Sequence, residues 1–118
     1  MIVQAVKTVK VRPNETTIFE LLDSSLPSIQ ERSIVVITSK VVSICEGRTV
    51  PAATVDKEEL IRREADLYFF PNTEDGKHRY HFTIVNNTLI PASGIDESNG
   101  DGHLVMWPKD PQKKASQI

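Results

Sequence analysis

Two short polar segments hold the residue types that could carry out chemistry. The first, residues 38–48, reads TSKVVSICEGR and places Ser39 and Lys40 directly after an apolar run. A lysine ammonium group supplies positive charge to a phosphate, and a serine hydroxyl or a backbone N–H supplies hydrogen bonds. The spacing is not that of a P-loop, because the glycine-rich lead-in is absent. A Ser-Lys pair that only faces solvent at the end of a strand remains the alternative to a phosphate site.

The second segment, residues 93–103, reads SGIDESNGDGH and is rich in oxygen ligands. Carboxylate and carbonyl oxygens on a glycine-rich loop suit a hard divalent cation such as Mg²⁺ or Mn²⁺. An EF-hand is excluded, because a register that starts at Glu97 puts Pro108 where the bidentate glutamate is required. A polar surface turn remains the alternative. The candidate ligands are Asp96, Glu97, Asn99, Asp101 and His103.

The balance of charge argues against a nucleic-acid partner. The chain carries 14 basic and 16 acidic side chains, a formal net charge of −2, and its basic residues are scattered. The densest group, Arg62 and Arg63, lies among glutamates and indicates a solvated helix face. We therefore expect neither DNA nor RNA as the main partner.

The single cysteine and the lack of a long apolar run bear on the compartment. Cys45 has no partner for an internal disulfide, which suits a reducing environment, and its apolar neighbours favour a buried structural thiol over a nucleophile. No apolar run approaches the roughly 20 residues that cross a membrane, and no signal-peptide pattern follows Met1. We expect a cytoplasmic protein without membrane contact.

The elements that must position the two polar segments include several short strands. The alternating residues 2–11 predict a half-buried strand, and the β-branched run 34–38 predicts a strand with both faces covered. Residues 80–85 predict another strand, after which Asn86 and Asn87 turn the chain and the sequence TLIPA continues it.

Helix-start signals mark the remaining elements. Thr17, with Glu20 three residues later, predicts a short helix that ends before Pro27. Asp56 predicts a longer helix over DKEELIRREADLYF, residues 56–69, ended by Pro71 and the polar run 72–78.

The C-terminal segment carries a third helix-start signal. Asp110 supplies an N-cap acceptor and Pro111 suits the first helical position, yet only seven residues follow Pro111. So short a helix has little reason to form alone, so we expect the ancestral domain to have continued beyond Ile118. The elements together predict one domain, residues 1–118, with an α+β fold. We expect a mixed or mostly antiparallel sheet of about five strands and two or three short helices.

The order of the segments resembles the coenzyme F-420 gamma-glutamyl ligases over about residues 33–118. In that family the pattern is SK-x-V-S-x-x-EGR, then AG-x-D-x-SN, then LLP-x-DPD-x-SA. The matching residues are Ser39, Lys40, Val42, Ser43, Glu46, Gly47 and Arg48, then Gly94, Asp96, Ser98 and Asn99, then Pro108, Asp110, Pro111, Ala115 and Ser116.

The resemblance implies a reaction. Family members use GTP and a divalent metal, Mg²⁺ or Mn²⁺, to join L-glutamate to a carboxylate of the coenzyme precursor. The carboxylate is activated as an acyl phosphate, which the glutamate amino group then attacks. By position, Ser39, Lys40 and Asn99 would bind the nucleotide, GTP or GDP, and Asp96 would bind the metal. The resemblance also implies a homodimer, and it assigns no catalytic residue in this chain.

Departures from the family pattern keep three hypotheses open. Ile44 stands where the family has a second lysine, and an apolar side chain cannot make that phosphate contact. The family's second group of metal and nucleotide ligands would follow residue 118, so we expect an incomplete, N-terminal part of the ligase that is inactive alone. The hypotheses are a ligase domain completed by another chain, a degenerate nucleotide- or metal-binding module, and an assembly domain without a small-molecule site.

Overall fold

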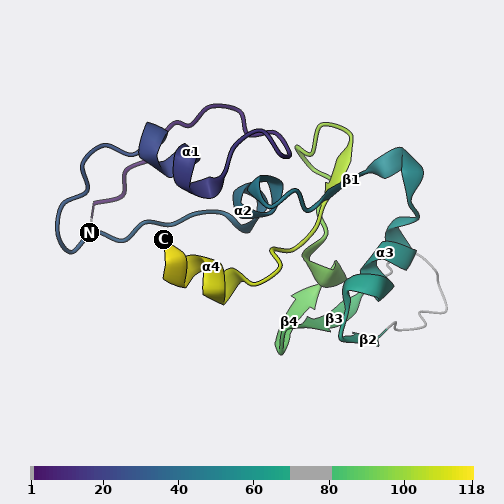
Figure 1. Ribbon diagram of the computed structural model, residues 1–118. Coiled ribbons are helices and arrows are strands. Elements are labelled where there is room, and N and C mark those ends of the chain that lie inside the picture. The colour runs from purple at the N-terminus through teal and green to yellow at the C-terminus, as the bar shows by residue number, and fades with distance from the viewer. Residues whose placement is uncertain (1, 70–80) are drawn as a thin grey trace.

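The computed structural model describes residues 2–69 and 81–118, whose helices and strands are arranged as Figure 1 shows. The α-helices are α1 (Ile18–Ser25), α2 (Ser39–Cys45), α3 (Lys57–Glu64) and α4 (Pro111–Gln117). The strands are β1 (Thr49–Pro51), β2 (Leu67–Phe69), β3 (Phe82–Val85), β4 (Thr88–Pro91) and β5 (His103–Val105). Two 3₁₀ turns, η1 (Ala52–Thr54) and η2 (Ala92–Gly94), complete the described elements.

The α+β class and the antiparallel pairing are confirmed. The strands form two small sheets, β1-β5 and β2-β3-β4, and every pairing in them is antiparallel. The described strands therefore match the expected number but are divided between two sheets. The described α-helices number four, against the expected two or three. The additional one is α2, which follows Thr38 and was not predicted from the sequence.

The hairpin of β3 and β4 follows the sequence prediction. Asn86 and Asn87 have φ angles of 50° and 60°, both in the left-handed region. A two-residue turn of this type matches the twist of the strands that it joins, and asparagine tolerates it well. The register pairs Val85 with Thr88 and Phe82 with Pro91.

The predicted helix starts are all present. The Thr17 hydroxyl accepts from the Glu20 N–H while the Glu20 carboxylate accepts from the Thr17 N–H, which completes the capping box of α1. Asp56 accepts from the Glu59 N–H at 2.8 Å and caps α3. Asp110 caps α4, with Pro at the first helical position. A cap satisfies N–H groups that have no partner inside the helix, which explains why these starts could be predicted.

The second predicted helix is shorter than expected. It ends at Glu64, because Ala65 is extended, with φ −87° and ψ 133°. The expected last turn is instead β2, where Leu67 pairs with Ile84 of β3. Tertiary pairing with a neighbouring strand has overridden the helical spacing of the sequence. The predicted helix end at residues 71–78, and residue 80 of the predicted strand, lie outside the described residues.

Two predicted strands were wrong. Residues 2–11 and 34–38 belong to no helix and no sheet of the described structure. Ile34 and Val36 are 87% and 86% exposed, whereas Ile37 packs against the cluster of Ile18, Leu21 and Val42, so the run is not covered on both faces as predicted. A β-branched run makes a strand only where another strand accepts its backbone hydrogen bonds, and the described residues offer these two segments none.

The end of this run is also different from the prediction. Residues 39–45 form helix α2, whose first turn is capped by the Thr38 hydroxyl accepting from the Val41 N–H at 3.4 Å. Ser39 and Lys40 therefore lie in the first turn of a helix rather than at the exit of a strand.

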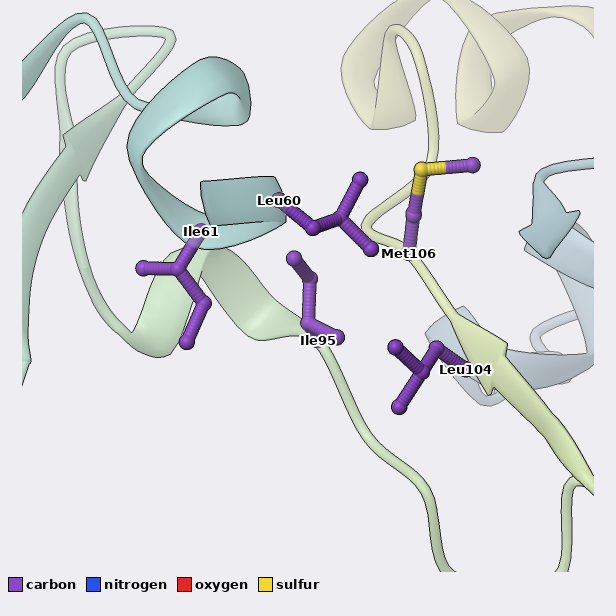
Figure 2. Close-up of a cluster of buried hydrophobic side chains, with 5 residues drawn as sticks. All are labelled: Leu60, Ile61, Ile95, Leu104 and Met106. Atoms are coloured by element: carbon purple, nitrogen blue, oxygen red, sulfur yellow. The ribbon is translucent and has the colours of Figure 1, made fainter. Parts of the chain in front are cut away.

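Apolar side chains gather in two clusters. One joins α3, the end of η2 and β5, where Figure 2 shows Leu60 and Ile95 pointing towards each other. Its buried residues are Leu60, Ile61, Ile95, Leu104 and Met106. The other joins α1 and α2 through Ile18, Leu21 and Val42. Each fully buried side chain of this size contributes about 1.5–3 kcal/mol, so these clusters hold the short elements together.

Arg48, just after α2, links the chain that follows β5 to the end of α3. Its Nε donates to the Trp107 carbonyl oxygen at 2.6 Å, and its guanidinium group also pairs with Glu64 at the end of α3. The Arg48 carbonyl oxygen accepts from the Met106 N–H at 3.0 Å. Arg48 of the EGR sequence therefore holds the chain just after β5 against the end of α3.

Gly94 and Gly102 provide a matched test of the packing against Trp107. Both have left-handed backbones, with φ +68° and +80°. A Cβ at Gly94 would lie 2.5 Å from the Trp107 ring, whereas a Cβ at Gly102 would meet nothing within 4 Å. We predict that Gly102→Ala lowers the free energy of unfolding by about 1–2 kcal/mol through backbone strain alone. Gly94→Ala should cost about 2–4 kcal/mol, because overpacking is added.

Urea unfolding of both variants measures this difference, provided that the m-value is unchanged. Equal losses in the two variants would show that Trp107 gives way without cost.

Candidate functional site

The candidate site lies where the first turn of α2 meets the chain after η2. Lys40 is in the first turn of α2, and Asp96 follows Ile95, a residue of the buried apolar cluster. The Asp96 N–H donates to the Val105 carbonyl oxygen at 2.9 Å, and the Val105 N–H donates back to the Asp96 carbonyl oxygen at 2.8 Å. Both backbone bonds run to a buried strand, so the Asp96 backbone is firmly placed.

Buried hydroxyl groups hold η2, the turn that precedes Asp96, in place. Ser93 is fully buried, and its Oγ donates to the Ile61 carbonyl oxygen of α3 at 2.9 Å. The Ser93 N–H donates to Thr83 Oγ1 at 2.8 Å, and that hydroxyl in turn donates to the Ile90 carbonyl oxygen. Buried polar groups that are all paired in this way rigidify the segment that carries them.

Lys40 and Asp96, far apart in the sequence, form an ion pair. Lys40 Nζ lies 2.6 Å from Asp96 Oδ2, and it also donates to the Ser98 carbonyl oxygen at 2.6 Å. The Lys40 side chain is 26% exposed and that of Asp96 is 47% exposed, so the pair is reachable from solvent. The structure thus brings together the predicted phosphate-binding lysine and the predicted metal ligand.

These contacts change the acidity of Asp96. The Lys40 hydrogen bond, followed by two hydrogen bonds from Ser98, lowers the pKa of the Asp96 carboxyl group to about 2. A carboxylate that accepts several hydrogen bonds and faces a cation is stabilised in its charged form. Asp96 is therefore an anion at any physiological pH, as a metal ligand must be.

A small cavity of about 150 Å³ lies beside this pair. Its lining residues are Ser39, Lys40, Gly94, Asp96, Val105 and Met106. The Ser39 hydroxyl makes no hydrogen bond to the rest of the described chain, so it is free to contact a ligand. The cavity has room for a group of a few atoms, about the size of one phosphate, rather than for a whole nucleotide.

Asn99 is not part of this cavity. It lies on the same loop as Asp96, with φ 59°, and its side chain is exposed. Its amide makes no hydrogen bond within residues 2–69 and 81–118. Of the predicted site residues, Ser39, Lys40 and Asp96 therefore lie together, whereas Asn99 is close to Asp96 in the sequence but does not line the cavity.

The acidic residues of the loop do not converge. Asp101 pairs with Lys10 at 2.9 Å and Glu97 with Lys57 at 3.5 Å, each away from Asp96. Among the described residues, no group of three or more His, Cys, Asp or Glu side chains is placed to hold a metal ion. Asp96 still fits Mg²⁺, which proteins often hold by one or two carboxylates while phosphate oxygens and waters complete the shell.

Ile44 and Cys45 lie on α2 and are both half-buried. Cys45 packs against the cluster of α1 and α2, and burial raises the pKa of its thiol. A thiol of this kind is protonated at neutral pH, which agrees with the structural rather than the nucleophilic interpretation.

Ser98 is a further candidate site residue, to which the sequence analysis assigned no role. It was part of the family pattern, yet only the structure shows it between Asp96 and Lys40. The signal available in the sequence was the two-residue spacing from Asp96 to Ser98, which lets an aspartate accept from the N–H two residues on.

Asp96 should give the protein a specific acid sensitivity. Its pKa of about 2 in the folded state is lower than the ordinary 3.8, so its stabilising contribution is complete above pH 3.8 and is lost as the pH falls towards 2. Because Asp96 is 47% exposed, solvent screening limits this contribution to about 1 kcal/mol or less. We predict that unfolding free energy falls less between pH 5 and pH 2, by about this amount, in Asp96→Asn than in the original chain.

A carbon-13 titration of the Asp96 carboxyl group checks the cause directly. Its midpoint near 2 should rise in Lys40→Met, and it should not move in Lys10→Met, which removes the lysine that pairs with Asp101 instead. An unmoved midpoint in Lys40→Met would contradict the ion pair.

Comparison with known proteins places these features in a family. The profile of the family described as F420-0:Gamma-glutamyl ligase matches residues 5–118, which include both polar segments and the whole cavity. No solved structure matches the chain. None of the helices in the described residues is long and apolar enough to cross a membrane. The match covers almost the entire sequence, and the chain therefore belongs to the F420-0:gamma-glutamyl ligase family.

Proposed function

We propose that this chain forms a nucleotide- and metal-binding part of a GTP-dependent gamma-glutamyl ligase. The enzyme would join L-glutamate to a carboxylate of the coenzyme F420 precursor. Membership of the family supports the ligase reaction. The observation that carries the finer proposal is the contact between Lys40 and Asp96 beside the free Ser39 hydroxyl and a phosphate-sized cavity.

Lys40 is the proposed phosphate ligand. Its ammonium group has three N–H donors, and the described contacts are Asp96 Oδ2 at 2.6 Å, the Ser98 carbonyl oxygen at 2.6 Å and Ser98 Oγ at 3.3 Å. The longest contact is the weakest, so a phosphate oxygen would replace Ser98 Oγ first. Lys40 would then bridge Asp96 and the nucleotide.

Asp96 is the proposed ligand for Mg²⁺ or Mn²⁺. A bound ion would neutralise the charge that spreads over the phosphoryl group during transfer. The remaining ligands would come from phosphate oxygens, from water, and from groups that the described residues do not provide. Asn99, exposed on the same loop, would contact the nucleotide from outside the cavity.

The proposed reaction has two balanced steps. A carboxylate oxygen of the precursor attacks the γ-phosphorus of GTP, forms an acyl phosphate and releases GDP. The amino nitrogen of L-glutamate then attacks the acyl carbon, which forms the amide bond and releases inorganic phosphate and one proton. Lys40 would hold phosphate charge through the first step, and no residue of this chain is assigned as a base.

We also propose that the protein works as a cytoplasmic homodimer. Support for the dimer comes from the extended segment 33–38, where Ile34 and Val36 are exposed although their residue types favour burial. A second copy could supply a strand partner for this segment. The single cysteine supports a reducing compartment.

One observation favours a second candidate function. Ile44 replaces the second phosphate-binding lysine of the family, which lowers the positive charge available to a triphosphate. The alternative is a degenerate module that binds nucleotide and metal, or assists assembly, without ligating.

A thermal-shift titration with GDP and Mn²⁺ tests nucleotide binding. At about 100 Kd of ligand, binding should stabilise the folded state by about 2.7 kcal/mol, which for this size is about 10 °C in Tm. We expect Asp96→Asn and Lys40→Met to abolish most of the shift. Asp101→Asn is the matched control. It removes an exposed carboxylate from the loop that carries Asp96, and that carboxylate pairs with Lys10 instead of Lys40. A full shift in Asp96→Asn, or no shift in the original chain at millimolar ligand, would refute the nucleotide site.

An assay with GTP, L-glutamate and the coenzyme precursor separates the ligase from the degenerate module. The ligase predicts one GDP and one phosphate for each glutamyl amide that forms, in the presence of Mg²⁺ or Mn²⁺. Binding of GDP without any amide product would favour the degenerate module, and Ile44→Lys should then strengthen GDP binding by restoring a phosphate contact.

A further inference from the structure

Ser98 contacts both charged groups of the candidate site. Its N–H donates to Asp96 Oδ1 at 2.7 Å, and its hydroxyl donates to Asp96 Oδ2 at 2.9 Å. Its carbonyl oxygen accepts from Lys40 Nζ at 2.6 Å. One small residue therefore fixes the carboxylate at both oxygens and the ammonium group at a third point.

These contacts leave the carboxylate with one open position. A carboxylate has about four acceptor positions, two on each oxygen. On Asp96, Oδ2 accepts from Ser98 Oγ and Lys40 Nζ, whereas Oδ1 accepts only from the Ser98 N–H within the described chain. A second ligand can therefore reach Oδ1 without displacing Lys40.

The backbone around Ser98 forms a turn that is held by its own hydrogen bonds. Asn99, Asp101 and Gly102 all have positive φ angles, of 59°, 54° and 80°. The Gly100 N–H donates to the Glu97 carbonyl oxygen, and the His103 N–H donates to the Gly100 carbonyl oxygen at 3.0 Å. This sharp turn aims both the N–H and the carbonyl oxygen of Ser98 inwards, at Asp96 and Lys40.

We propose that Ser98 is a positioning residue of this site, which orients the Asp96 carboxylate for a divalent cation at Oδ1 and holds Lys40 on the phosphate side. This inference rests on the proposed function. Partners that orient a metal-binding group commonly change metal affinity by about 10–100-fold when they are removed. Ser98→Ala keeps both backbone contacts and loses only the hydroxyl, so the lower end of that range applies.

The test measures Mn²⁺ affinity by water-proton relaxation, with and without saturating GDP, and needs no turnover. We expect Ser98→Ala to weaken the Asp96-dependent Mn²⁺ binding about tenfold. Ser98→Thr keeps the hydroxyl and should bind nearly as well as the original chain. Thr54→Val is the matched control, because it removes an exposed hydroxyl that bonds only the Pro51 carbonyl oxygen. Thermal unfolding of each variant confirms that it is folded.

The outcomes separate this inference from the function on which it rests. Unchanged Mn²⁺ affinity in Ser98→Ala, with loss in Asp96→Asn, would overturn the role of Ser98 and leave the metal site standing. Equal weakening in Ser98→Ala and Ser98→Thr would also overturn it, because the second variant retains the hydroxyl. If the original chain shows no Asp96-dependent Mn²⁺ binding, with or without GDP, the proposed function and the role of Ser98 fail together.

Discussion

Strand β5 is the constraint on which the candidate site depends, because it is paired along both edges. On one edge it pairs with β1, with Thr49 opposite Val105, and on the other Val105 exchanges two hydrogen bonds with Asp96. β1 follows α2 closely in the chain, so this arrangement carries Lys40 to the neighbourhood of Asp96. Leu104 and Val105 are buried, and the apolar cluster that includes Leu104 keeps this short strand in place.

The family pattern contains residues of two different kinds. Arg48 and Gly94 hold the frame: the first ties Trp107 to the end of α3, and the second lets the Trp107 ring lie directly against the backbone. Lys40 and Asp96 are partly exposed and line a cavity. A half-exposed ion pair contributes little to stability after solvent screening, so the Lys40–Asp96 pair is not one of the contacts that hold the frame together.

The charged groups of the candidate site are held by contacts within the described chain. Lys40 and Asp96 neutralise each other, and Ser98 satisfies what remains of their hydrogen-bonding capacity except at Oδ1. A phosphate and a divalent cation carry opposite charges, so each can be added beside the group of opposite sign while the pair stays intact. If a ligand binds beside these two groups, it would lose less conformational entropy from ordering their side chains, because they are already held in place.

By itself, the sequence determined the local features whose causes lie within a few residues. The caps at Thr17, Asp56 and Asp110 and the turn at Asn86 were predictable, because a short polar side chain satisfies nearby backbone groups whatever surrounds it. The α+β class and the positions of the two polar segments could likewise be predicted from the sequence. The placement of Ser39, Lys40 and Asp96 in one site came from the resemblance.

Only the tertiary structure decided which apolar runs became strands and which polar residues met. The run 34–38 had the residue types of a strand but no partner in the described chain, whereas Leu67–Phe69 had helical spacing and found one in β3. The contact between Ser98 and Lys40 was equally unpredictable, because it joins residues 58 positions apart in the sequence. Backbone pairing and side-chain contact are relations between distant segments, and the pattern of one segment does not contain the position of the other.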